Sequence, residues 1–167
     1  MISADHAQLM AKYNKWQNQS IYSAASTLTD EQRKQDRGAF FKSIHGTLNH
    51  LLWGDQTWMN RLARMPPPGA KSIADSASYY DDWSELRNQR EAYDEAIGQW
   101  ADSVSQSWLA EELSWYSGAA GRELSKPKWL LVTHFFNHQT HHRGQLHAML
   151  TAAGAKPEDT DIIVMPA

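Results

Sequence analysis

Apolar residues recur at intervals of three and four positions along most of the chain, a spacing that is typical of amphipathic helices. This pattern predicts four long helices, over residues 3–27, 43–65, 76–104 and about 125–154. Ser3 is a suitable N-cap for the first helix, and Gly154 is the residue expected just after the fourth. Pro127 suits the first turn of the fourth helix.

The segments between these helices are more polar or richer in breakers. Residues 28–43 form a polar connection in which a short helical turn is predicted after Thr29 or Asp30. The run from Pro66 to Gly69 ends the second helix. Residues 113–124 contain glycines and are predicted to be a loop with a short extended piece.

The closing residues, 155–167, are predicted to be an ordered tail that packs Ile162, Ile163 and Val164 into the fold. No internal repeat or low-complexity tract interrupts the pattern. The predicted fold class is therefore all-α: a four-helix bundle with longer connections and an ordered C-terminal tail, forming a single domain over residues 1–167.

Composition and charge narrow the function. The formal net charge of −3 and the lack of a basic stripe argue against binding to nucleic acid or to an anionic membrane surface. The chain has no cysteine, which excludes disulfides, thiolate metal sites and a cysteine nucleophile. No signal-peptide pattern or long apolar segment is present, so a cytoplasmic protein without membrane contact is expected.

Histidines cluster in the fourth predicted helix, in the segment "NHQTHHRGQL". At about 100° per residue, His142 lies inside the apolar sector of this helix and His138 lies on its border. His134 and His141 lie further out, and His147 faces away. His134 has the same spacing to His138 as His138 has to His142, so spacing alone does not choose between the two pairs; the apolar sector favours the second pair.

The second predicted helix supplies another histidine, His50, at the edge of its apolar sector. Two imidazoles one turn apart and a third from a facing helix would suit one metal ion. Asp55 lies inside the same apolar sector, where a carboxylate needs a partner; Arg143, a tryptophan N–H or a metal-bound histidine are the candidates. Gln145, beside His138 on the wheel, is a second candidate for orienting ligands.

Several of these residues can also be explained by structural roles alone. A histidine on an apolar face is more often a hydrogen-bonded core residue than a ligand, and His6 and His45 are assigned to that class, although His6 is also a minor candidate for lining a pocket. The eight tryptophans and six tyrosines are expected mainly to fill helix interfaces. The charges of the third predicted helix are interpreted as a solvated face.

The chain resembles the DinB-like (damage-inducible) superfamily of metal-dependent helical-bundle proteins, whose relatives include bacillithiol transferases and mycothiol-dependent maleylpyruvate isomerases. The resemblance is carried by three segments and by the closing tail: "YNKWQNQSIY", "FFKSIHGTLNHLLWGDQTWMNRL", "HFFNHQTHHRGQLHAML" and "AKPEDTDIIVMPA". The family's metal triad, carried over residue by residue, falls on His50, His138 and His142, the set that the helical wheel favours. His134 and His141 receive no ligand role in this transfer.

The resemblance implies a divalent metal ion, with zinc or nickel preferred and iron or manganese left open, and a low-molecular-weight thiol as a second cofactor or substrate. The expected chemistry is metal-assisted thiol transfer, isomerisation or hydrolysis of a small electrophilic molecule. The competing interpretation is a non-catalytic metal-stabilised bundle or small-ligand-binding protein. A homodimer is expected in either case.

Overall fold

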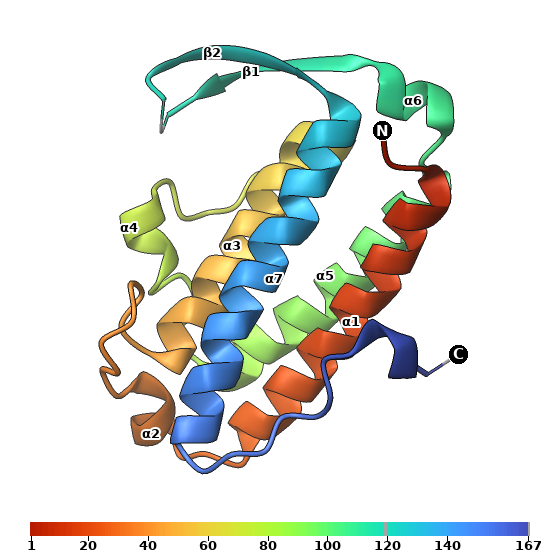
Figure 1. Cartoon of the computed structure of the whole chain (residues 1–167). Helices are drawn as coiled ribbons and strands as arrows, with labels where there is room; N and C mark the ends of the chain where they lie inside the picture. The colour runs from red at the N-terminus through yellow and green to blue at the C-terminus, as the bar shows by residue number, and fades with distance from the viewer. Residues whose placement is uncertain (119, 167) are drawn as a thin grey trace.

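Four long helices form the body of the protein in a computed structural model that describes residues 1–118 and 120–166 (Figure 1). They are α1 (Ala4–Ser26), α3 (Ile44–Ala63), α5 (Trp83–Ser103) and α7 (Lys128–Ala152). Helix α1 packs against α5 and α7, and α3 packs against α7 and α5, so the four follow the order α1, α7, α3, α5 around the bundle. The all-α bundle prediction is confirmed.

Shorter elements occupy the connections. They are α2 (Asp30–Lys34), α4 (Ile73–Ser76), α6 (Gln106–Ala110), the strands β1 (Glu112–Ser117) and β2 (Arg122–Pro127), and the 3₁₀ helix η1 (Ile162–Val164). No helix in the described part of the chain combines the length and the apolar character needed to cross a lipid bilayer.

Side-chain caps fix where α1, α3 and α5 begin. The hydroxyl of Ser3 accepts a hydrogen bond from the backbone N–H of His6, which confirms the predicted cap of α1. The third long helix begins at Trp83, not at residue 76 as the periodicity predicts. The reason is that Asn49 on α3 pairs with the backbone N–H and carbonyl of Tyr80, while the carboxylate of Asp82 caps α5.

A β-hairpin replaces most of the predicted loop over residues 113–124. Strands β1 and β2 pair antiparallel from Glu112 opposite Pro127 to Ser117 opposite Arg122. Helix α7 therefore begins at Lys128 and not near residue 125, because the preceding residues are held in this ladder. The hairpin extends over the end of the bundle where α3 ends and α7 begins (Figure 1).

The C-terminal tail is held along α1 by polar contacts. Tyr13 donates its hydroxyl to the carbonyl of Thr160, and Gln17 donates its amide to the carbonyl of Asp159. The prediction that three tail residues pack into the fold is wrong, since Ile163 is 88% exposed and Ile162 and Val164 are also exposed. Hydrogen bonds to the tail backbone, and not buried apolar side chains, hold this segment.

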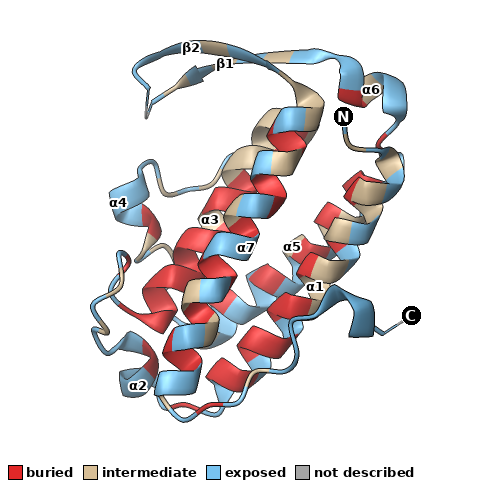
Figure 2. Ribbon diagram, in the orientation of Figure 1, coloured by how far each residue is buried: buried red, intermediate tan, exposed pale blue. Residues whose placement is uncertain are grey.

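The buried residues are concentrated on the four long helices (Figure 2). Among them are two hydrophobic clusters with polar residues between them. One cluster includes Leu48, Leu52 and Leu86, and the other includes Met59 and Ile97. Buried polar side chains from all four long helices lie between these levels: Asn14, Asn18, Asp55, Arg90, Asp94, Gln139 and Arg143. We call this set the polar layer. The histidines described next lie beside it.

Candidate metal centre

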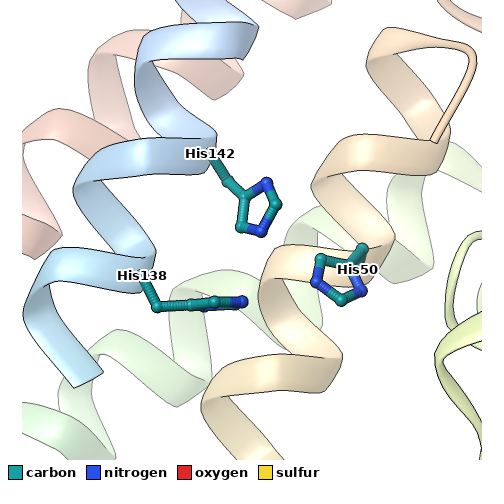
Figure 3. Close-up of side chains that lie close together, drawn as sticks. All are labelled: His50, His138 and His142. Atoms are coloured by element: carbon teal, nitrogen blue, oxygen red, sulfur yellow. The ribbon is translucent and has the colours of Figure 1, made fainter. Parts of the chain in front are cut away.

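Three histidine side chains meet between α3 and α7. Each of His50, His138 and His142 offers one ring nitrogen, and these nitrogens all lie within 4.8 Å of one another. Figure 3 shows the two α7 rings and the α3 ring directed into the same space. His50 and His142 are buried, at 4% and 7% exposure, and His138 is half-buried. Such a cluster is compatible with binding a metal ion.

Hydrogen bonds from outside the cluster set the tautomers of two of these rings. The Nδ1 atom of His50 lies 2.8 Å from the hydroxyl of Ser76, and that hydroxyl donates to the carbonyl of Ile73. The hydroxyl oxygen therefore accepts from Nδ1–H of His50. The Nδ1 of His142 lies 2.9 Å from Oε1 of Gln145, which can only accept. Both rings are thereby left with an unprotonated Nε2, the form in which imidazole binds a metal.

Burial keeps the cluster uncharged. Burial and, to a smaller extent, the neighbouring His142 lower the pKa of His50 and of His138 to about 3. Burial also lowers the pKa of His142, although the hydrogen bond that its Nδ1–H donates to Gln145 opposes this shift. The three rings are therefore neutral at neutral pH, and each has one unprotonated nitrogen. A divalent cation binds imidazole through such a nitrogen.

His138 lies against the backbone of α3 at a glycine. A Cβ atom added to Gly54 would come within 2.7 Å of Cε1 of the His138 ring, closer than real contacts allow. The buried Nδ1 of His138 has no hydrogen-bond partner in the described part of the chain. The close approach to Gly54 and this unpaired nitrogen both fit a ring placed to bind a ligand between the helices.

Replacing Gly54 with alanine is expected to weaken zinc binding about tenfold, because the added methyl group pushes His138 out of line with the other two rings. The helix itself favours alanine by about 1 kcal/mol, so a loss of affinity without loss of folding would assign the effect to the ring. Isothermal titration with zinc measures the affinity, and thermal unfolding measures the fold.

Two other helical glycines provide matched controls for this change. Gly98 on α5 and Gly144 on α7 have open space where a Cβ would be added, so alanine at either position should leave zinc affinity unchanged. Equal affinities for G54A, G98A and G144A would show that His138 does not depend on the approach to α3.

Aromatic rings surround the cluster. Phe41 stacks on His50 with ring centroids 3.7 Å apart and contacts His142 edge-on at 5.6 Å. Trp53 lies on another side of His50, at 5.6 Å. Next to Phe41, Lys42 adopts a left-handed backbone with φ of 64°, so the segment that places this ring carries some strain. The surroundings of the three histidines are thus largely apolar.

The partner of Asp55 differs from the prediction. Arg90 donates Nη1 to Oδ2 of Asp55 at 2.6 Å, and Gln139 donates to Oδ1 at 3.0 Å. Arg143, one of the three candidates from sequence, instead donates to Asn14. The interpretation of α5 as a solvated charged face is therefore wrong for Arg90 and for Asp94, its buried partner.

The remaining histidines lie outside the cluster. His134 and His141 are exposed neighbours, with ring centroids 6.1 Å from His138 and 4.9 Å from His142 respectively. His45 is hydrogen-bonded to the carbonyl of Tyr80, as expected of a buried structural histidine. No sequence pattern indicates a role for Ser76, which the periodicity places at the start of a long helix. The contact of Gln145 with a cluster histidine agrees with its expected orienting role.

Comparison with known proteins shows which family this chain is similar to. The chain matches the family described as "DinB family" over residues 3–166. It is 26% identical to "Protein DinB" of Bacillus subtilis (strain 168) over 158 residues, which cover 95% of this chain and 92% of that protein. It also resembles the crystal structure of a DinB-like protein from Bacillus cereus ATCC 10987, with a TM-score of 0.65, 16% sequence identity and coverage of 86% of this chain and 90% of that one.

Proposed function

Since this chain belongs to the DinB family, we propose that His50, His138 and His142 bind one divalent metal ion and that this centre acts on a small electrophilic molecule. The observation that carries the proposal is the convergence of three neutral imidazoles from two helices. Ser76 and Gln145 hold two of them in the metal-binding tautomer.

Zinc and nickel are the proposed ions. Imidazole nitrogen suits both, and also suits iron, while manganese prefers oxygen ligands more strongly. Among the described residues no carboxylate belongs to the cluster, so the ligand set is purely nitrogen. Three protein ligands leave at least one coordination position for an exogenous group, which is the arrangement of catalytic rather than structural zinc sites.

The residues of this chain determine which reacting groups must come from a cofactor or a substrate. A bound divalent ion would supply Lewis acidity and would lower the pKa of a coordinated thiol or water. Because the chain has no cysteine, any thiol must come from a cofactor or a substrate. Phe41 and Trp53 give the centre apolar walls that limit access of bulk water. We propose thiol transfer or isomerisation as the reaction, with hydrolysis as a variant that uses the same centre.

One observation favours a second candidate, a metal-stabilised bundle without catalysis. Asp55, the buried carboxylate nearest in sequence to the histidine of α3, is engaged by Arg90 and Gln139 and is not free to act as a base. A metal centre without a general base can simply bind its ion. It can also support a reaction in which the metal itself makes a coordinated thiol acidic, since such a reaction needs no protein base.

The two candidates are separated by one experiment on purified protein. The protein is loaded with zinc or nickel, its metal content is measured by elemental analysis, and consumption of free thiol is followed with a panel of electrophiles and esters. The catalytic proposal expects about one ion per chain and turnover that stops when a chelator is added. Retention of the ion with no turnover across the panel would support the non-catalytic bundle.

A further inference from the structure

A cleft of about 470 Å³ opens at the hairpin end of the bundle, away from the three histidines. It lies where α3 and α5 end, beside α6 and the start of α7 (Figure 1). Its lining combines basic and apolar side chains, chiefly Arg61, Arg64, Lys128, Trp100, Trp108 and Leu113. A cleft of this size is in the range of small-molecule sites.

The charges around this cleft are unbalanced. Three basic residues line it and no acidic residue does. Lys128 is paired with Glu111 at 2.6 Å, but neither Arg61 nor Arg64 takes part in an ion pair within the described ranges. The uncompensated positive charge is therefore that of two arginines, and an anion would balance it.

Aromatic rings hold the guanidinium of Arg61. Its guanidinium carbon lies 4.7 Å from the centre of the Trp58 ring and 5.9 Å from that of Trp115. The side chain is half-buried, and burial lowers its pKa, with no carboxylate to oppose the shift. Trp58 and Trp115 do not line the cleft themselves, but stacking on their faces fixes the plane of the guanidinium, whose fork of N–H donors matches a carboxylate.

The apolar part of the lining indicates what accompanies the anionic group. Trp100 is 7% exposed, and Trp108 and Leu113 are half-buried beside it. Trp100 and Trp108 lie edge to face, with centroids 6.0 Å apart. These surfaces would cover a flat hydrocarbon body while the arginines pair with a charge at its edge.

We propose that this cleft binds an organic carboxylate with an aromatic or otherwise apolar body, the carboxylate at Arg61 and Arg64 and the body against Trp100 and Trp108. The site is separate from the histidine cluster. Arg61 follows Gly54, the residue that His138 contacts, by seven positions, or about 10 Å along α3. Binding in the cleft requires no metal, so this inference stands apart from the function proposed above.

Isothermal titration with 2-naphthoate and with the uncharged 2-naphthamide tests the site, in protein prepared with and without zinc. We expect naphthoate to bind about tenfold more tightly than the amide, which is the effect of one charge-assisted contact. The variant R61Q should lower naphthoate affinity to that of the amide, and R64Q should lower it in the same direction. Removal of zinc should leave naphthoate affinity unchanged.

Arg122 supplies the matched control, because it is an exposed arginine of the hairpin that does not line the cleft. R122Q changes the net charge as R61Q does and should leave naphthoate affinity unchanged, while circular dichroism verifies that both variants are folded. Equal binding of acid and amide, an equal loss in R122Q, or no measurable binding at millimolar naphthoate would overturn the proposal. Loss of binding on zinc removal would place the anion at the metal centre and overturn it as well.

Discussion

Alanine at His50, His138 or His142 is expected to reduce bound zinc from about one ion per chain to a small residue. Each substitution leaves two imidazoles, and since replacing even the outer partner of a ligand costs about 10- to 100-fold in affinity, loss of a ligand should cost at least about 100-fold. Elemental analysis after dialysis against a weak chelator gives the metal content, and competition titration gives the affinity.

The exposed neighbours on the same helix are the controls for this experiment. His134 and His141 lie within one turn of a cluster histidine, but neither ring joins the cluster of converging nitrogens. H134A and H141A should therefore keep their zinc. If H50A and H142A retained full metal content while H134A lost it, the ligands would be a different set and the assignment from the cluster would be wrong.

The meeting of His138 with His142 follows from local sequence, whereas the position of His50 beside them depends on the fold. Two residues four positions apart share a helical face wherever the helix lies. A contact between α3 and α7 depends on how the helices pack. The sequence indicates only which face of each helix is apolar and therefore points into the bundle. The family resemblance, which the match over residues 3–166 confirms, supplied the remaining constraint.

The sequence indicates that Asp55 of the polar layer is buried, but it does not predict that Arg90 and Asp94 are buried with it. Arg90 and Asp94 lie on the same helical stripe as Leu86 and Ile97, so their burial has a signal in the spacing. Most other charged residues of α5 are exposed, so the spacing of Arg90 and Asp94 did not stand out among them. The choice of Arg90 over Arg143 as the partner of Asp55 required the packing of α5 against α3, which no local pattern specifies.

Competing local contacts explain the errors at the ends of elements. The predicted start of the third helix at residue 76 assumed that periodicity continues, but Ser76 ends α4 and donates to the carbonyl of Ile73. The periodicity predicts that the tail buries three apolar residues, but the backbone carbonyls of Thr160 and Asp159 instead accept hydrogen bonds from side chains of α1. A pattern of hydrophobic residues cannot predict specific hydrogen bonds of this kind.

Arg90 stands at the centre of the polar layer. Its two terminal nitrogens lie 2.6 Å from Oδ2 of Asp55 and 2.8 Å from Oδ1 of Asp94, and all three side chains are almost completely buried. Burial raises the pKa of Asp94 to about 6 and raises that of Asp55, and Arg90 opposes both shifts. One guanidinium is thus the cation that faces two buried carboxylates.

Replacing Arg90 with methionine is expected to lower the free energy of unfolding by about 3–5 kcal/mol, because it leaves two buried carboxylates without their cation. The loss should be smaller near pH 5 than at pH 7. Without Arg90 the pKa values of both carboxyls rise further above their unfolded values, so the folded state takes up protons as the pH falls and part of the penalty disappears. Urea unfolding at the two pH values measures both effects.

The same helix provides the comparison that isolates burial. Arg87 pairs with Glu91 at 2.9 Å, also four residues apart, but both side chains are at least half exposed. R87M should therefore cost no more than about 0.5 kcal/mol. The double variant R90M/D55N should be more stable than R90M, since it removes one of the uncompensated charges. If R90M were no less stable than R87M, water or protons would already balance these carboxylates, and the polar layer would not depend on its arginine.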